Sequence, residues 1–467
     1  MSNPFDIQKF EEILSLERET LEGAINETHD NLKSILKSDN YVLAEELKIS
    51  LLNLGKLYDL TDTAKIGKAI DVLSNEDPLK YLMEYYQTRH SGDLKLGKII
   101  FIAIANQSIL NSEGIQPHLG GRSGTGKTHA AKTVVAIIPD MPYKKEGSLS
   151  AKSLYYQKDL PDGLIFFSDD IKISPDLEDT LKRSMSNFQE NTIHNTVING
   201  AAGTLELPKR IMWLLTSVAI DGSDELRNRL YQQNVDESCM QDENVAKMQL
   251  EEACHVERYD GLEDIKIICQ LIIYIIKKQL FEVDVPYSKS ILPSKHVTKD
   301  RRRLPRFIDM IKGIALFNFM QRQFDDRGRL IATLDDFYEA KELFEANIES
   351  QVTNLTPAEL RLAKWLFEKA KSVSINDIVN EYLKPDGTQF NPESIRKTLQ
   401  GTKTREGLIA KLPGLLVDET KREVKYLLPN LEIFEGELIT LEKENATSET
   451  PNLSHSCVAL EKLEQEA

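Results

Sequence analysis

The sequence predicts an α/β fold in which a parallel sheet carries a phosphate-binding loop and helical regions lie on either side of it in the chain. Two features lead to this fold class. A glycine-rich loop at residues 121–128 precedes an expected helix, and an apolar strand at 164–167 runs directly into two aspartates. A helix, helix, helix, hairpin pattern after residue 355 adds a separate small domain.

The residues 121–128, Gly-Arg-Ser-Gly-Thr-Gly-Lys-Thr, fit the phosphate-loop pattern G-x-x-x-x-G-K-[ST]. Lys127 would place its charge on the β- and γ-phosphates of ATP, and the Thr128 hydroxyl could ligate Mg²⁺. A helix from about Thr128 to Ile138 would add its positive N-terminal end. A plain glycine-rich turn is the alternative, and the acidic strand that follows argues against it. The expected nucleotide-binding residues are Gly121, Ser123, Gly124, Thr125, Gly126, Lys127, Thr128 and His129.

The run Leu164–Phe167 reads as a buried parallel strand whose carboxyl end carries Asp169 and Asp170. Asp169 would hold Mg²⁺ together with Thr128, and Asp170 would orient the attacking water. An apolar run that ends in two aspartates is also a common way for a strand to enter a turn. Its position about forty residues after the phosphate loop favours the metal site.

A further strand at 211–215 ends in Thr216, which could touch the γ-phosphate or the attacking water. The segment 224–230 then contains Arg227 and Arg229. In ring-forming ATPases an arginine in this position reaches into the neighbouring subunit's site. We favour Arg229 for that role, with a solvated helix face as the alternative, especially for Arg227. The strand before the phosphate loop carries Pro117, which a central strand tolerates only at its start.

The order of these elements resembles the AAA+ ATPases. A helix at 176–188 followed by two β runs around a Gly-Ala-Ala-Gly turn at 200–203 is similar to the inserted hairpin of the MCM branch, and less closely to superfamily 3 helicases. A plain surface hairpin is the alternative. Arg306 resembles the second sensor arginine of AAA+ lids, which contacts the γ-phosphate. Arg302 is the second candidate for this role. The alternative is that Arg306 belongs to a solvated basic patch.

Four stretches, 150–156, 225–229, 235–238 and 301–307, are similar to ATPases of plasmids, phages and integrated elements that are often encoded with or fused to a DNA primase. The resemblance covers roughly residues 93–350. It implies ATP and Mg²⁺ as cofactors, assembly into a hexameric ring, action on DNA and a separate primase as a candidate partner. The acid pair departs from the family, which usually has Asp-Glu or Glu-Glu.

Composition argues against a general nucleic-acid binder, a zinc protein, a secreted protein and a membrane protein. The chain has 58 basic and 74 acidic residues and a formal charge of -16, so any DNA contact must come from local basic patches or an assembled pore. The four cysteines lack the spacing of a zinc site. The N-terminus does not read as a signal peptide, and the most apolar run, 265–276, is too short to span a bilayer. We therefore expect a cytoplasmic protein without membrane contact.

The C-terminal pattern predicts a winged helix. Its helices are expected from 356 to about 370, at 374–383 and at 391–399, and the wing at 415–428. Basic residues occur where DNA contacts would be made, although many winged helices bind only proteins. These residues are Arg396, Lys397, Lys403, Arg405, Lys421 and Arg422.

Five regions follow from this survey. They are an N-terminal helical domain at 1–92, the ATPase core at 93–240, a helical lid with the second sensor at 241–352, the winged helix at 353–434 and a disordered acidic tail at 435–467. The leading hypothesis is a ring-forming ATPase that moves on DNA, specifically a replication helicase of a mobile element. A DNA-binding regulatory protein and an ATPase partner of a separate primase are the competing hypotheses.

Overall fold

The structure is a computed structural model. It describes residues 7–35, 48, 55–56, 58–121, 124–139, 144–146, 160–198, 201–217, 223–236, 239–254, 261–298, 300–352, 357–383, 389–402, 405–412, 414–418, 424–429 and 438–442.

A five-stranded parallel sheet forms the centre of the fold, in the order β2-β3-β6-β1-β7. The strands are β1 (Pro117–Gly120), β2 (Lys144–Glu146), β3 (Ile165–Ser168), β6 (Met212–Thr216) and β7 (Tyr231–Asn234). Every residue of β3 and β6 is buried, as expected for strands of a parallel sheet that is covered on both faces. Pro117 is the first residue of β1, the one position where a central strand tolerates proline. Strand β6 lies between β1 and β3, so their three carboxyl ends meet at one edge.

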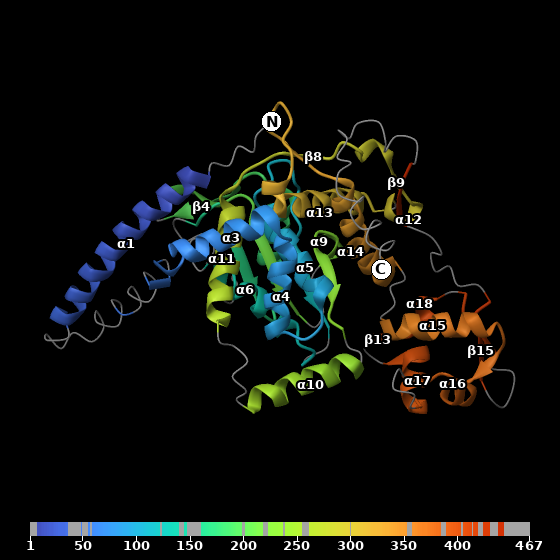
Figure 1. Cartoon of the computed structure of the whole chain (residues 1–467). Coiled ribbons are helices and arrows are strands. Elements are labelled where there is room, and N and C mark those ends of the chain that lie inside the picture. The colour runs from blue at the N-terminus through green and yellow to red at the C-terminus, as the bar shows by residue number, and fades with distance from the viewer. Residues whose placement is uncertain are drawn as a thin grey trace, which may run out of the picture.

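Helices pack on one face of the sheet in the largest hydrophobic cluster. They are α3 (Thr63–Asn75), α4 (Pro78–Arg89), α5 (Leu94–Asn106), α6 (Lys127–Val135), α11 (Leu262–Lys278) and α13 (Arg303–Phe317). Helix α5 buries ten of its 13 residues, because helices and the sheet surround it (Figure 1). The predicted boundaries at 92 and 240 therefore fall within one continuous core, which joins α3 and α4 to the sheet and to α11 and α13.

A second cluster covers the other face of the sheet around Trp213. It includes α8 (Pro175–Ser186), which begins at an N-cap where Ser174 accepts a hydrogen bond from the Leu177 N–H, with Pro175 at the first position. This helix agrees with the predicted one within two residues at each end.

The predicted hairpin is present, as β4 (Thr192–Ile198) paired antiparallel with β5 (Ala201–Leu207). The expected position of its turn is wrong, because Ala201 pairs with Ile198 and Gly203 pairs with Thr196. The two strands thus leave only residues 199 and 200, Asn-Gly, between them, and these lie outside the described residues. Asn-Gly is the strongest short-range hairpin signal, and the small residues after it belong to the strand.

The remaining elements connect this core. The helices are α1 (Ile7–Ile35), α9 (Asp224–Arg227), α10 (Cys239–Ala253), α12 (Lys295–Thr298) and α14 (Leu334–Val352). Short strands and turns are β8 (Val283–Asp284), β9 (Ile291–Pro293), β10 (Leu330–Ile331), η1 (Ser288–Ser290) and η2 (Phe319–Gln321). Among the residues described, no helix is both long and apolar enough to cross a membrane.

A third cluster, separate from the other two, contains the C-terminal elements. They are α15 (Pro357–Lys369), β11 (Val373–Ser374), α16 (Ile375–Glu381), α17 (Pro392–Gln400), β12 (Gly401–Thr402), β13 (Arg405–Glu406), α18 (Leu408–Lys411), β14 (Leu416–Asp418) and β15 (Lys425–Leu427). Strand β15 pairs antiparallel with both β11 and β14, around the buried Tyr426. The three predicted helices and the predicted hairpin are present as α15, α16, α17 and β14–β15, but β12, β13 and α18 lie between the third helix and the hairpin. Lys403, Lys421 and Arg422 lie outside the described residues.

The predicted disorder of the tail at 435–467 is wrong for residues 438–442. Strand β16 (Ile439–Leu441) pairs antiparallel with β9. The N–H groups of Leu438 and Ile439 both donate to the Glu345 carboxylate, at 2.7 and 3.2 Å, and both side chains are buried. Two apolar residues with a partner strand outweigh the acidic composition around them. Residues 443–467 lie outside the described residues.

Candidate nucleotide-binding site

The phosphate loop joins β1 to α6 at the carboxyl edge of the sheet. Gly124 and Gly126 have positive φ angles of 83° and 92°, a backbone conformation that side chains rarely adopt. Gly126 is the N-cap of α6, and Lys127 is its first residue. The Lys127 ammonium donates to the Gly121 carbonyl at 2.8 Å, which draws the two ends of the loop together. Ser123 lies outside the described residues.

Three predicted residues from three different segments meet beside this loop. The Oδ1 atom of Asp169 accepts hydrogen bonds from the Thr128 and Thr216 hydroxyls, each at 2.6 Å. Burial raises the pKa of Asp169, but the bonds from the two threonines outweigh it, and the net pKa lies below the ordinary value. Asp169 is therefore a carboxylate at neutral pH, fixed against the first turn of α6 and the end of β6.

Asp170 follows at a positive φ of 45°, which aspartate tolerates better than most residues. Its backbone N–H donates to the Thr216 hydroxyl at 3.1 Å, and its side chain is exposed. The Thr216 hydroxyl thus donates to the carboxylate of Asp169 and accepts a hydrogen bond from the backbone N–H of Asp170. This arrangement holds Asp170 at the tip of β3 and next to Asp169.

The donor set beside the loop fits a magnesium ion. Thr128 and Asp169 offer a hydroxyl and a carboxylate oxygen, the ligand chemistry that Mg²⁺ prefers. Within the described residues there is no cluster of three or more His, Cys, Asp or Glu side chains that could hold a metal. Magnesium in nucleotide sites needs none, because it takes one or two protein ligands and completes its shell with phosphate oxygens and water.

His129, predicted among the nucleotide-binding residues, contacts another histidine in the structure. Its Nδ1 atom lies 2.8 Å from Nδ1 of His90, and the Nε2 atom of His90 lies 2.9 Å from the Asp93 carboxylate. Asp93 also accepts the backbone N–H of Asp236 at 2.7 Å. Burial, and then the neighbouring His90, lower the pKa of His129.

His90 also lies close to the phosphate loop, since its Cε1 atom is 3.6 Å from the point where a Cβ of Gly126 would stand. Sequence reasoning missed both His90 and Asp93 because no motif marks them. They reach the loop only through the packing of α4 and α5 against α6.

The predicted arginines lie elsewhere. Arg229, Arg302 and Arg306 line one cavity of about 420 Å³, together with residues 112–114 and 116, which precede β1, and residues 185–190, which end and follow α8. The Nη2 atom of Arg306 donates to the Asn228 carbonyl, close to the start of β7. Because Tyr231 of β7 pairs with Pro117, the first residue of β1, this cavity lies at the amino edge of the sheet.

The phosphate loop and the arginine cavity are therefore at opposite ends of the strands. The four residues of β1 separate the two ends by about 13 Å, at about 3.3 Å per residue. The structure brings Lys127, Thr128, Asp169 and Thr216 together, and it brings Arg229, Arg302 and Arg306 together. It does not bring the second group to the phosphate loop of the same chain.

Comparison with known proteins identifies a P-loop domain in the region that contains the first group. Residues 63–277, less than half of the chain, match a family described as MTBMA_p00010 P-loop domain. The match begins at α3, includes the phosphate loop and ends in α11, so it spans the sheet and the helices of the shared core up to α11, without α13. The similarity supports a P-loop NTPase that binds nucleotide.

A curated protein of Methanothermobacter marburgensis, named uncharacterized protein MTBMA_p00010, is 24% identical over 301 residues. The alignment covers 60% of this chain and 36% of the relative, so the chain spans about a third of the length of the protein that it matches. Neither description names an activity.

Proposed function

We propose that the protein hydrolyses ATP with Mg²⁺, and that copies of the chain complete one another's active sites. One observation carries the first part: Thr128 from the helix after the phosphate loop and Thr216 from β6 both donate to the same carboxylate oxygen of Asp169. This contact links the phosphate-binding element to the acidic strand, as a nucleotide triphosphatase requires. The match to a P-loop domain family supports it.

Each residue has a role that follows from its atoms. Lys127 supplies a cation to the β- and γ-phosphates, and Thr128 and Asp169 would hold the metal. Magnesium, when bound with ATP, neutralises phosphate charge. Asp170 orients the attacking water, and Thr216 fixes the position of both acids. The positive end of α6 adds to the attraction for phosphate.

The second part of the proposal rests on the arginine cavity. Three guanidinium groups line one cavity, together with the side chains of Glu113 and Glu190, and the planar fork of a guanidinium suits a phosphate group. The nearest phosphate site of the same chain is at the opposite edge of the sheet. A neighbouring copy in a ring would bring its phosphate loop to this cavity, as the resemblance to AAA+ ATPases implies, and Arg229 and Arg306 would then act on the neighbour's nucleotide.

Mixing two inactive variants tests the shared site. Lys127→Ala subunits lack a working phosphate loop, and Arg229→Ala subunits lack the arginine. In an equimolar mixture, some interfaces pair an intact loop with an intact Arg229, so ATP hydrolysis should return to a measurable fraction of the wild-type rate. A mixture no more active than its components, with mixed assemblies shown to form, would refute the shared site but not ATP hydrolysis.

We further propose that the motor acts on DNA, as a replication helicase of a mobile element. The exposed Arg396 and Lys397 on α17 support a DNA contact, since their side chains are 56% and 59% exposed and pair only loosely with Glu393. Displacement of one strand of a forked duplex should require ATP and fail with a non-hydrolysable analogue. DNA binding without displacement would favour a regulatory ATPase or a primase partner.

The matched test of that contact is Arg396→Glu with Lys397→Glu. It should weaken DNA binding, with affinity falling less steeply with salt, and leave basal ATP hydrolysis unchanged. Deleting everything after residue 355 would be a poorer test, because it also removes β16 and its pairing with β9 in the core. Unchanged DNA affinity in the charge-reversed protein would indicate that this domain binds protein instead.

A further inference from the structure

Arg229 is held in place by three hydrogen bonds from its guanidinium group. Its Nε donates to the Ser186 hydroxyl at the end of α8, Nη1 donates to the backbone carbonyl of Glu225, and Nη2 donates to the Glu225 carboxylate, each at 2.9 Å. A guanidinium has five N–H donors, so these three contacts leave one on each Nη atom. Arg229 also lines the cavity that contains Arg302 and Arg306.

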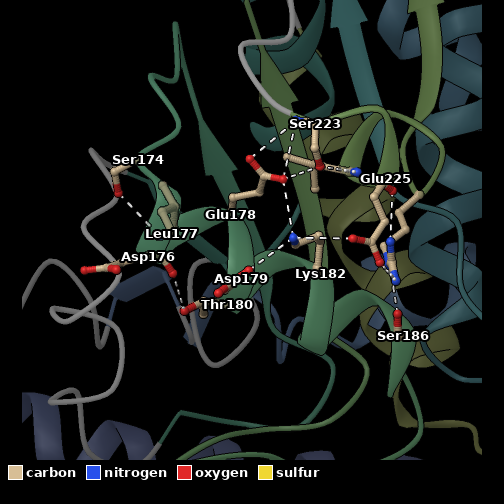
Figure 2. A network of polar contacts seen from close by, with 12 residues as sticks. Ser174, Asp176, Leu177, Glu178, Asp179, Thr180, Lys182, Ser186, Ser223 and Glu225 are labelled. Carbon is tan, nitrogen blue, oxygen red and sulfur yellow. Dashed lines mark hydrogen bonds and ion pairs between the residues drawn. The ribbon is translucent and has the colours of Figure 1, made fainter.

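Glu225 is itself held by Lys182 of α8, whose ammonium lies 3.5 Å from its Oε2 atom. Figure 2 shows Lys182 among three carboxylates, with Glu178 and Asp179 on its own helix and Glu225 opposite. The two oxygens of Glu225 thus have different partners, Arg229 on one side and Lys182 on the other. The hydrogen bond from Arg229, and then its charge, lower the pKa of Glu225, which is a carboxylate at neutral pH.

The start of α9 is fixed to α8 at a second point. The hydroxyl and the backbone N–H of Ser223 both donate to the Glu178 carboxylate, and the Ser223 hydroxyl accepts the Leu226 N–H at 3.3 Å (Figure 2). Two carboxylates, Glu178 and Glu225, therefore hold the short helix that carries Glu225 against α8. The backbone carbonyl that Arg229 uses is fixed by the same contacts.

We infer that Glu225 is a positioning residue for Arg229, and that Lys182 fixes Glu225 in the orientation that does so. A free arginine side chain has many rotamers, and ordering it when a phosphate arrives has an entropic cost. The contacts with Glu225 and Ser186 impose that order in advance and present one N–H on each Nη atom to the cavity. This inference rests on the proposed role of Arg229 in a neighbour's site.

An alternative is that Glu225 restrains Arg229 and keeps it from the phosphate. The geometry favours positioning, because the second Glu225 oxygen is already bound to Lys182 and Arg229 donates one of its three hydrogen bonds to a backbone carbonyl. Removing the carboxylate distinguishes the two roles by sign: positioning predicts slower hydrolysis, and restraint predicts faster hydrolysis.

The test uses full-length Glu225→Ala and Glu225→Gln proteins. Glu225→Ala should lower kcat by about 10- to 100-fold, the size of effect that misplacing a reacting group produces, with nucleotide affinity unchanged. Glu225→Gln keeps an oxygen that can accept the Arg229 bond and should stay within about threefold of wild type. Asp179→Ala is the matched control: Asp179 contacts the same Lys182 at 3.1 Å, whereas the hydrogen bonds described for Arg229 go to Ser186 and Glu225, so the kcat of this variant should not change.

Subunit mixing adds a readout that misfolding cannot imitate. Glu225→Ala mixed with Lys127→Ala should regain activity, because the second variant supplies an intact Glu225 and Arg229. Glu225→Ala mixed with Arg229→Ala should regain none. If Arg229→Ala complements Lys127→Ala but Glu225→Ala does not, the inference about Glu225 fails while the shared site stands. If neither Arg229→Ala nor Glu225→Ala complements Lys127→Ala, the shared site is refuted, and the inference that rests on it is refuted as well. A rise in kcat for Glu225→Ala would establish restraint instead.

Discussion

The two edges of the parallel sheet carry opposite chemistry. At the carboxyl edge, the phosphate loop, Asp169 and Thr216 form a connected set that combines a lysine with acids and hydroxyls. At the amino edge, three arginines share a cavity with backbone and side chains that precede β1 and follow α8. The first edge carries the groups that our proposal assigns to a nucleotide and its metal, whereas the second carries three arginines beside Glu113 and Glu190.

The difference follows from the direction of the strands. In a parallel sheet all carboxyl ends lie together, so residues that directly follow strands converge without further specification. Residues at the amino edge converge only if helices bring them there. Arg229 does so through α9 and its contacts with α8, and Arg306 through the packing of α13. The arrangement at the carboxyl edge therefore follows from the topology of the sheet, whereas the arginine cavity at the amino edge depends on the packing of helices and side chains.

The largest expected effect comes from the carboxyl edge. Lys127→Ala removes the cation that meets the β- and γ-phosphates, so ATP hydrolysis should fall by about 10³-fold or more and nucleotide affinity should fall with it. Phosphate release and titration with a fluorescent nucleotide measure the two separately. Lys68→Ala, an exposed lysine paired with Asp71 and Glu76, is the control and should change neither. Undiminished hydrolysis by Lys127→Ala protein would remove the basis of the proposed function.

A smaller and more selective effect is expected at the amino edge. Arg306→Ala should lower kcat by about 10- to 100-fold while each subunit binds nucleotide as before, because Arg306 is remote from its own phosphate loop. Arg302→Ala should act in the same direction. Arg301→Ala is the matched control, since Arg301 is exposed and is absent from the residues that line the cavity. Weaker nucleotide binding by Arg306→Ala subunits would instead support a sensor that acts within its own chain.

Sequence reasoning recovered the carboxyl edge almost completely. Asp169 directly follows β3, Thr216 ends β6, and Lys127 and Thr128 begin the helix after the loop that leaves β1; strand ends in a parallel sheet share an edge. The helix before the hairpin was predictable from Ser174 and Pro175, a cap and a first-turn proline. These signals are local, so the elements that they predict do not depend on distant parts of the chain.

The parts that sequence reasoning missed depend on partners that lie far away in the chain. The apolar faces of α3 and α4 predict helices but do not say that they pack on α5 and α11, so the boundary at 92 was placed inside a core. Strand β16 has only three residues and forms because β9 is beside it. The position of Arg306 depends on how α13 packs, and its place at the start of a helix gives no hint of which site it faces.

The last prediction concerns the anchor of the arginine cavity. Asp309 lies one turn after Arg306 on α13, and its carboxylate accepts the backbone N–H of Glu113, a cavity residue, at 2.9 Å. Burial raises the pKa of Asp309 to about 6, although Lys312, at 3.5 Å, opposes the shift. A pKa above the unfolded value means that the native state holds the proton more tightly, so this contribution to stability is present below pH 4 and is lost as the pH rises through 6.

Asp309→Asn should remove that loss. Asparagine keeps an oxygen for the Glu113 N–H and carries no charge to bury, so the free energy of unfolding of the variant should improve relative to the parent between pH 4 and 7. Two pKa units correspond to about 3 kcal/mol, and we expect a gain of about 1–3 kcal/mol. Denaturant unfolding of both proteins at each pH measures the difference between their free energies of unfolding. Groups that titrate alike in the two proteins do not contribute to this difference. A difference that does not change with pH would mean that Asp309 ionises freely, and that the amino edge tolerates the charge.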